Sequence, residues 1–395
     1  MKIIKYILVI IPYLALIAVL YFFFNRFIIN DKNGNPVYGF EYTKDGLEKD
    51  QSYIFYSDKN KKIVSVSTDK KIIQKELTAN SLSISPAYND KVNFQIPIKD
   101  SLVVNEDRYL TNQKIVAISD IEGNFKVFTD FLINNKIIDK NLNWIFDKGH
   151  LVCNGDFFDR GNDVTATLWL IYKLEEEAKK AGGEVHFILG NHEEMNIQGN
   201  VKYVQLKYRT LASELNIPYK ELYGKNSELG RWLRTKNAMV KINDILFTHG
   251  GISPLFVEKK YSIQEGNNLI RSYLGEDVDY IKFINPRAYF LYDRQGPFWY
   301  RGYFGDYKEY YKGASQKDVD KITNYLGVSK IVVGHSIVDK VKSLFQNKVI
   351  AIDVMEDSDP RKSNDDSMAN SCQGLLVENS TYYRIYSNGK KEKLF

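Results

Sequence analysis

The chain has 395 residues, of which 44% are hydrophobic, so it is long and apolar enough for a large buried core and is not a disordered chain. Its formal net charge is +5, an excess too small and too dispersed to indicate a nucleic-acid partner. The two cysteines, Cys153 and Cys372, are too few for a structural zinc site, and both a disulfide and two free thiols stay open for them.

An uncharged apolar run from Tyr6 to Phe24 opens the chain. Its length matches the roughly 20 residues that span a bilayer as a helix. No A-x-A-like site of small residues follows the run, which favours a retained anchor over a cleaved signal peptide. Lys2 and Lys5 precede it, so the short side is expected in the cytoplasm. We therefore predict a single-pass anchor over residues 1–30, with the rest of the chain outside the cytoplasm.

Residues 31–111 are predicted to form a β-rich extension between this anchor and the main domain. Short alternating runs such as SYIFYSD and KIVSVST are typical of strands, and turns rich in Asp, Asn, Lys and Gly separate them. The extension carries no motif of known chemistry.

From residue 112 to 395 strand and helix patterns alternate. KIVAIS, HLVCNG and EVHFIL predict strands, the spacing over 125–138 and the run from Asp163 to Gly182 predict helices, and AMVKINDILFTH predicts a hairpin. Such alternation predicts an α/β domain with a mainly parallel central sheet. Helical and aromatic-rich segments near 197–237 and 254–313 interrupt it and are interpreted as insertions.

Polar residues of metal-ligand type directly follow five of the predicted strands, in SDIEG, NGDFFDRG, LGNHEE, THGG and VGH. The carboxyl ends of strands in α/β sheets meet in one crevice, so we expect these motifs to face one site. His150 and His186 instead lie at the start of, or within, apolar strands and are interpreted as structural. The candidate ligands are Asp120, Glu122, Asp156, Asn191, His249 and His335.

These six residues offer oxygen and imidazole ligands without a thiolate, a set that suits Mn, Fe, Zn or Mg. Six ligands are too many for one catalytic ion with open positions. They fit two ions that share one carboxylate and a bridging hydroxide.

The order of the five motifs resembles that of the calcineurin-like metallophosphoesterases, and specifically the phosphoprotein phosphatase branch with its bacterial relatives. The resemblance runs from Ile115 to about Asp353, and GDFFDRG and GNHE favour this branch over the diadenosine tetraphosphatase branch. It implies the calcineurin-like fold, central β-sheets flanked by helices, and the hydrolysis of phosphomonoesters by a metal-bridging hydroxide.

Carried over residue by residue, the resemblance also implies two divalent or mixed-valence metal ions, Mn or Fe first, with Zn or Mg as alternatives. Asp120 and Glu122 would bind the first ion, Asp156 would bridge both, and the second would be held by Asn191, His249 and His335.

The same resemblance assigns the remaining catalytic roles. His192 would be the general acid that protonates the leaving oxygen, and Asp159 would orient it. Arg160 would clamp the phosphate oxygens. Arg301 is the loosest match, as the family's second arginine, and the alternatives for it are Arg231 and Arg234.

Glu122 departs from the family pattern, which has histidine at this position. A carboxylate there can still bind a metal, but it lowers the net charge of the loaded site by one. We therefore predict either a weaker pair of Lewis acids or a preference for a harder or trivalent ion, such as Fe(III), in the first site. The alternative is that Glu122 only forms hydrogen bonds beside that site.

The predicted function is phosphomonoester hydrolysis by a phosphoprotein phosphatase of serine/threonine or tyrosine type, acting on a phosphorylated protein or small molecule. One alternative is a nucleotide or dinucleoside polyphosphate hydrolase, in which the aromatic segment RAYFLYDRQGPFWYRGYF stacks on a base rather than packing in the core. The other is a binding module that keeps the fold without turnover.

Overall fold

The computed structural model describes residues 28–30, 36–38, 46–57, 60–78, 81–89, 91–99, 101–354 and 372–395. Across these ranges we find no helix whose length and hydropathy would let it cross a bilayer. The predicted anchor over Tyr6–Phe24 lies outside the described residues.

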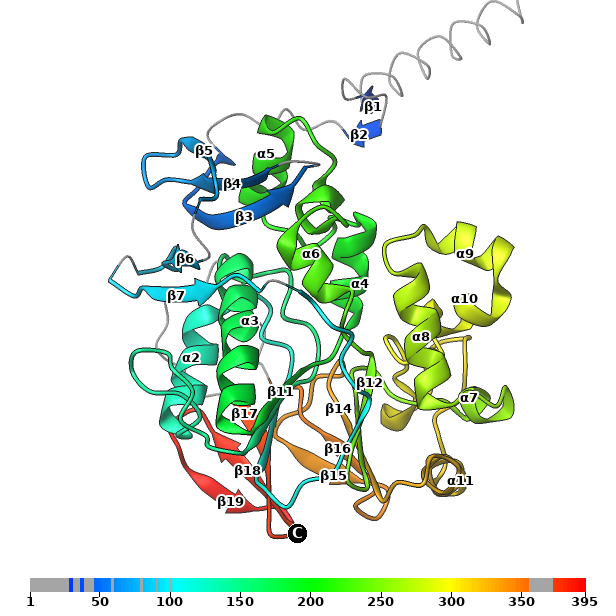
Figure 1. Ribbon diagram of the computed structural model, residues 1–395. Coiled ribbons are helices and arrows are strands. Elements are labelled where there is room, and N and C mark those ends of the chain that lie inside the picture. Colours follow the sequence, from blue (N-terminus) through cyan, green and yellow to red (C-terminus); the bar gives the residue numbers. More distant parts are fainter. Residues whose placement is uncertain are drawn as a thin grey trace, which may run out of the picture.

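Two six-stranded sheets form the centre of the molecule, with the strand orders β11-β10-β9-β17-β18-β19 and β15-β16-β14-β13-β12-β8 (Figure 1). The strands of the first sheet are β9 (Ile115–Ile118), β10 (His150–Cys153), β11 (Glu184–Phe187), β17 (Gln373–Glu378), β18 (Thr381–Tyr386) and β19 (Lys391–Lys393). Those of the second are β8 (Arg108–Tyr109), β12 (Met239–Ile242), β13 (Ile245–Thr248), β14 (Lys330–Val333), β15 (Lys342–Leu344) and β16 (Val349–Ala351).

Both sheets are mixed, so the prediction of one mainly parallel sheet is wrong in this respect. Strands β9, β10 and β11 are parallel, as are β13, β14 and β16. Antiparallel strands flank both groups: β17 pairs with β9, and β12 with β13. The pairing of Val116 with Leu376 joins opposite ends of the domain, and no local sequence pattern specifies it.

Helices α2 (Phe125–Asn134) and α3 (Val164–Ala181) lie side by side against the first sheet (Figure 1). Both were predicted. Helix α3 ends at Gly182, whose φ of 82° is the left-handed conformation that glycine adopts without strain. Lys179 and Lys180 in its last turn complement the negative end of the helix dipole.

The two predicted insertions are helical. Residues 197–237 contain α5 (Leu206–Glu214), η2 (Tyr219–Tyr223) and α6 (Glu228–Leu233), beside α4 (Asn191–Gln198). Residues 254–313 contain α7 (Pro254–Glu258), α8 (Ile263–Tyr273), α9 (Val278–Ile284), α10 (Pro286–Tyr292) and η3 (Gly302–Phe304), and helix α11 (Gln316–Leu326) packs on α7 (Figure 1).

The β-rich segment contains β1 (Ile28–Asn30), β2 (Pro36–Tyr38), β3 (Asp50–Tyr56), β4 (Lys61–Val66), β5 (Ile72–Glu76), β6 (Ser81–Ile84) and β7 (Phe94–Pro97). SYIFYSD and KIVSVST lie on β3 and β4, as predicted. Polar contacts fasten β3 to the main domain. Trp169 Nε1 donates to Ser52 O at 2.8 Å, and Tyr56 Oη donates to Glu228 Oε2 at 2.6 Å.

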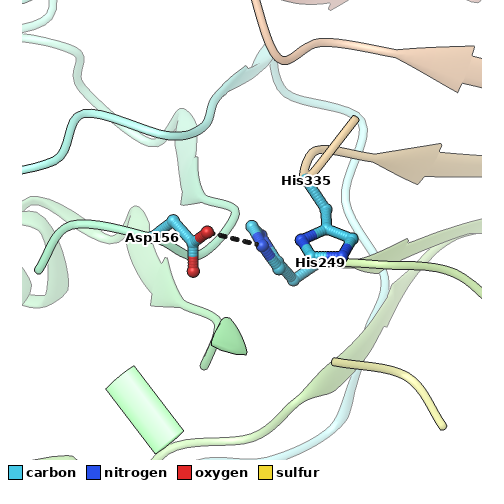
Figure 2. A group of neighbouring side chains, drawn as sticks. All are labelled: Asp156, His249 and His335. Carbon is cyan, nitrogen blue, oxygen red and sulfur yellow. Dashed lines mark ion pairs between the residues drawn. The ribbon is translucent and has the colours of Figure 1, made fainter. Parts of the chain in front are cut away.

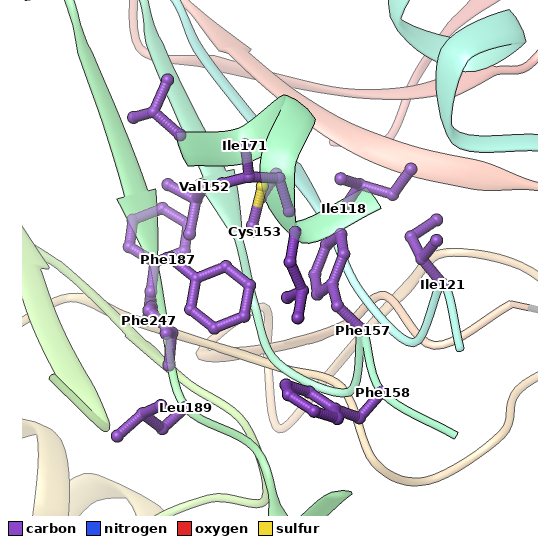
Figure 3. Close-up of a cluster of buried hydrophobic side chains, with 14 of the residues drawn as sticks. Ile118, Ile121, Val152, Cys153, Phe157, Phe158, Ile171, Phe187, Leu189 and Phe247 are labelled. Atoms are coloured by element: carbon purple, nitrogen blue, oxygen red, sulfur yellow. The ribbon is translucent and has the colours of Figure 1, made fainter. Parts of the chain in front are cut away.

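A large apolar cluster fills the space beneath the motif loops (Figure 3). It includes Phe157 and Phe158 from the loop after β10, which are fully buried and anchor that loop to the core. Cys153 is a small, fully buried core residue. Both cysteines are buried and free, so the alternative of a disulfide is not realised.

Candidate active site

Six strands place the motif residues together. β9, β10 and β11 end just before the first three motifs, and β13, β14 and β16 end just before His249, His335 and Asp353. Hydrogen bonds join the two sheets at this edge: Asn154 Nδ2 donates to Thr248 O at 3.1 Å, and the backbone N–H of His335 donates to Asp120 Oδ2 at 3.2 Å. The predicted convergence at the carboxyl ends of the strands is confirmed.

The motif loops hold six non-glycine residues in the left-handed backbone conformation, which costs on the order of 1–3 kcal/mol for each of them. The surrounding loops enforce it, because the backbone N–H groups of Asp120 and Glu122 donate to Gly155 O and Asp156 O, each at 3.0 Å. Strain of this kind gathers where side chains must converge. The six residues are Asp120, Glu122, Asp156, Asp159, Arg160 and His335.

Two motif glycines are required by close packing against the candidate ligands. A Cβ atom at Gly190 would lie 2.3 Å from Asp156 Oδ1, and one at Gly155 would lie 2.5 Å from His249 Nδ1. Neither ligand side chain has room to retreat, because Asp156 and His249 are almost fully buried.

Asp156, His249 and His335 form a compact group whose ligand atoms lie within 4.8 Å of one another (Figure 2). Asp156 Oδ2 is 3.0 Å from His249 Nε2, which is also 3.1 Å from Asn191 Oδ1. His335 Nε2 is buried and has no hydrogen-bond partner among the described residues. A buried, unpaired imidazole nitrogen in such a group is an arrangement that a metal ion would satisfy.

A second group joins Asp156 to Glu122 and His192 within the same 4.8 Å limit. Asp156 therefore belongs to both groups, as a bridging ligand would. Asp120 lies beside them, and its Oδ2 accepts from Ser119 Oγ at 2.5 Å.

The charges in this cluster also favour a cation. Burial alone would lower the pKa of His249, but Asp156 and Asp120 outweigh it and raise the pKa to about 10. The pKa of His335 is lowered well below its usual value, first by burial and then by Arg301 and His249. Without a metal ion the carboxylates thus favour a positive charge at His249, where a bound ion would take the place of the proton, while His335 keeps a free ligand nitrogen.

His192 and Asp159 form a close pair, with 2.5 Å between Nδ1 and Oδ2. His192 is the second residue of α4, and its backbone N–H donates to Asp156 Oδ1 at 2.9 Å. Burial lowers the pKa of His192, but Asp156 and Asp159 outweigh it and raise the pKa above its usual value. His192 is therefore held in one orientation and favoured in its protonated form.

Two arginines lie at the same pocket. Arg160 pairs with Glu122, and its guanidinium lies 5.3 Å from the centre of the Tyr203 ring. Arg301 Nη1 donates to the backbone oxygen of His335 and, at 3.1 Å, to Ser336 Oγ.

The alternative arginines lie elsewhere. Arg231 pairs with Glu228 at 3.4 Å, and Arg234 donates to the backbone oxygens of Tyr223 and Gly230, both at 2.8 Å. The structure thus brings Arg301 to the pocket and neither of its two alternatives.

The candidate residues surround a pocket of about 220 Å³. Asn191 and His249 lie outside its lining, where His249 contacts both Asp156 and Asn191. Within the aromatic segment, Phe298, Tyr300 and Tyr303 are buried, which favours the packing interpretation over base stacking. The pocket is lined by Asp120, Glu122, Asp156, Arg160, His192, Arg301, His335, Ile337 and Asp353.

Sequence reasoning missed two acidic residues of the site. The Glu193 carboxylate accepts backbone hydrogen bonds from Gly190, Asp156 and Phe157 at 2.6–2.9 Å and so ties two motif loops together. Its place at the third position of α4, as in a capping box, was an available signal. Asp353 follows the buried strand β16, the same strand-then-acid pattern that identified Asp120.

This architecture and site define a phosphoesterase. Residues 113–339 match the sequence model of the Calcineurin-like phosphoesterase family, and the chain belongs to that family. Family membership implies divalent metal ions, and the residues present fit them: two groups of oxygen and imidazole donors share Asp156, and His335 Nε2 is unpaired.

Among particular proteins, the chain is similar to a cold-active protein-tyrosine phosphatase of a psychrophilic Shewanella species. The TM-score is 0.77 at 33% identity, over 88% of this chain and 100% of that one. It is also 32% identical to Shewanella-like protein phosphatase 1 of Plasmodium berghei over 60% of this chain, and 24% identical to Shewanella-like protein phosphatase 2 of Arabidopsis thaliana over 63%. The matches span 65% and 73% of those two relatives.

Proposed function

We propose that this chain is a metal-dependent phosphomonoesterase that acts on phosphoproteins. The observation that carries the proposal is the pair of His192 and Asp159, 2.5 Å apart, at a pocket that also presents Arg160 and Arg301. A buried, oriented proton donor beside two guanidinium groups suits a dianionic ester whose leaving oxygen needs a proton. Membership of the phosphoesterase family supports the same chemistry.

Two metal ions would be held by the residues already described. Asp120, Glu122 and Asp156 would hold the first, and Asp156 with Asn191, His249 and His335 the second. When bound, such ions supply a water-derived nucleophile at neutral pH and neutralise charge on the phosphoryl oxygens. The oxygen-rich donor set of the first site favours Mn or Fe over Zn, with Mg as a further candidate.

The side chains of the pocket have separate tasks in this proposal. Arg160 and Arg301 bind the phosphoryl oxygens, since a planar guanidinium matches two of them at once. His192 Nε2 donates its proton to the leaving oxygen, and Asp159 fixes the imidazole through Nδ1. Asp159 also stabilises the charged imidazole before the proton leaves.

Among phosphoproteins we favour phosphotyrosine as the substrate group. Ile337 lines the pocket and is 69% exposed, so it offers an apolar contact to a ring that enters the site. The structural relative from Shewanella is named as a protein-tyrosine phosphatase, which supports the same choice.

The sequence also leads us to propose that a membrane anchor over Tyr6–Phe24 holds this site outside the cytoplasm. A reporter enzyme fused after Phe395 tests the orientation. Reporter activity in the cytoplasm would overturn it.

The catalytic proposal is tested with the full chain, stripped with a chelator and resupplied singly with Mn²⁺, Fe²⁺, Zn²⁺ or Mg²⁺. We expect metal-restored hydrolysis of para-nitrophenyl phosphate and of a phosphotyrosine peptide, with slower turnover of the matched phosphoserine peptide. A folded chain without turnover on any of these substrates contradicts the enzyme and favours the binding module. Preference for a nucleoside phosphate over both peptides would instead favour the nucleotide hydrolase.

A further inference from the structure

Glu122 lies between two groups that compete for its carboxylate. On one side are Asp156 and His192, with which it forms the second candidate metal group. On the other side is the guanidinium of Arg160, with which it forms an ion pair. The Glu122 side chain is only 6% exposed, so its carboxylate contacts these protein groups rather than solvent.

The backbones of the two residues are tied together. Gly161 N, directly after Arg160, donates to Glu122 O at 2.7 Å, and Arg160 N donates to Tyr203 O at 3.1 Å. Both residues have left-handed φ angles, 49° for Glu122 and 53° for Arg160. The backbone conformations of the two loops therefore place the two side chains facing each other.

The charge of the pocket makes this pairing consequential. Four carboxyl groups line it against two guanidinium groups and the imidazole of His192, and those carboxyl groups that are ionised repel an entering anion before any cation binds. A phosphate dianion entering that pocket is repelled unless cations are added or an arginine is freed. The carboxyl and guanidinium groups are those of Asp120, Glu122, Asp156, Asp353, Arg160 and Arg301.

We propose that Glu122 is a shared carboxylate, which neutralises Arg160 in the metal-free protein and turns to the ion when the first site fills. Arg160 then becomes available to phosphate only after metal binds, so the two ligands bind cooperatively through one side chain. The proposal rests on the proposed function for one point, that Arg160 binds phosphate. The proposal also states what Glu122 changes relative to the family's histidine: a carboxylate can pair with Arg160, whereas a neutral imidazole cannot.

A rival geometry makes the opposite prediction. A guanidinium has five N–H donors, so Glu122 can hold one edge of Arg160 and leave the other pre-oriented for phosphate. Removing the carboxylate then weakens phosphate binding in the metal-free protein. Under our proposal the same change strengthens it.

The experiment measures the dissociation constant of inorganic phosphate by titration calorimetry, with the full chain either chelated or saturated with Mn²⁺. For the wild type we expect binding at least about tenfold tighter with Mn²⁺ than without. For Glu122→Gln in chelator we expect binding about tenfold tighter than the wild type, and a smaller gain on adding Mn²⁺. The matched control is Glu265→Gln, which removes the carboxylate partner of Arg287 on the exposed surface, 2.6 Å away, and should change nothing.

A double variant tests whether Arg160 is the group released. In Glu122→Gln with Arg160→Gln, the gain in phosphate binding should disappear. Equal or weaker phosphate binding in Glu122→Gln than in the wild type, both chelated and folded by circular dichroism, overturns the proposal. So does a gain that persists in the double variant.

Labelling with phenylglyoxal gives a second reading that needs no phosphate. We expect Arg160 to react slowly in the chelated wild type and faster in Glu122→Gln, as read by mass spectrometry. Equal rates would contradict the proposal that Glu122 holds Arg160 in the metal-free protein. Neither measurement uses turnover, so a failure of the proposed hydrolysis leaves these results interpretable, and a failure here leaves the hydrolysis intact.

Discussion

Two pairs of buried histidines, His249 with His335 and His150 with His186, differ in the charged groups that surround them. His249 lies among carboxylates at the carboxyl edge of the sheets, and its pKa is raised to about 10 although burial alone would lower it. His150 and His186 lie on β10 and β11 and contact each other, Nδ1 to Nε2, at 2.9 Å. For these two, burial prevails and the pKa is lowered. Buried histidines thus differ with their neighbours: carboxylates favour a positive charge at His249, whereas His150 and His186 stay neutral in the core.

The difference between the pairs explains why only one of them could serve chemistry. Near His249 the neighbouring His335 keeps an unpaired nitrogen, which a ligand would satisfy. In the other pair His150 Nδ1 and His186 Nε2 satisfy each other, and Tyr109 packs edge-on over His186 with 4.4 Å between ring centres. The structural interpretation of both histidines is confirmed.

The largest expected effect on activity is that of substituting His192, and the same substitution at His186 is its control. His192→Asn should lower kcat on an alkyl phosphate by about 10²–10⁴, because the leaving oxygen loses its proton donor. The loss on para-nitrophenyl phosphate should be smaller, since that leaving group is more acidic. His186→Asn should keep kcat per folded molecule and lower only stability, measured by urea unfolding. An equal loss on both esters would remove His192 from the acid role.

Glu193 offers the next largest effect, with Glu194 as its control. Glu193→Gln should lower the free energy of unfolding by about 3 kcal/mol, because one carboxylate accepts several backbone N–H groups and an amide accepts fewer. Burial raises the pKa of Glu193 to about 7 and that of Glu194, which is also buried, to about 8, so at pH 7.5 Glu193 is mostly a carboxylate while Glu194 is mostly neutral and resembles glutamine. Glu194→Gln should therefore cost less than about 1 kcal/mol. Similar losses would show that burial, and not loop tethering, matters at Glu193.

The site was more predictable than the sheets around it, for a physical reason. Asp120, Asp156 and His249 each follow an apolar strand. Because the loops at the carboxyl ends of parallel strands meet at one edge of a sheet, the local sequence was enough to predict that these distant residues lie close together. The pairing of β17 with β9 depends on contacts between distant segments, and nothing near residue 375 signals it. The Glu122–Arg160 pair depends on left-handed backbones in two loops, which residue types alone do not specify.

Substituting Asp353 tests whether this carboxylate, at the same edge of the sheets as the candidate ligands, contributes to cation binding. Burial raises its pKa first and Asp120 raises it further, so a bound cation is what would favour its charged form. Asp353→Asn should weaken Mn²⁺ binding about tenfold, within the range seen for residues beside metal ligands. Calorimetric titration with Mn²⁺ measures it, and Asp339→Asn on the surface is the control. Unchanged affinity would make Asp353 a bystander.

The smallest effect comes from the neutral histidine pair and appears as a dependence of stability on pH. Burial first, and then His150 and the cation Lys236, oppose the protonation of His186 in the folded state, so its pKa lies below the unfolded value of about 6.5. The contribution is fully present above that value and is lost as the pH falls below it, by at most about 1.4 kcal/mol per pH unit. Urea unfolding of the chelated chain at pH 7.5 and 5.5 isolates this contribution: lowering the pH should favour the folded state more in His186→Gln than in the wild type. The same change in the free energy of unfolding between the two pH values in the variant and in the wild type would show that His186 does not contribute to the pH dependence, and the two histidine pairs would no longer differ in the way their neighbours imply.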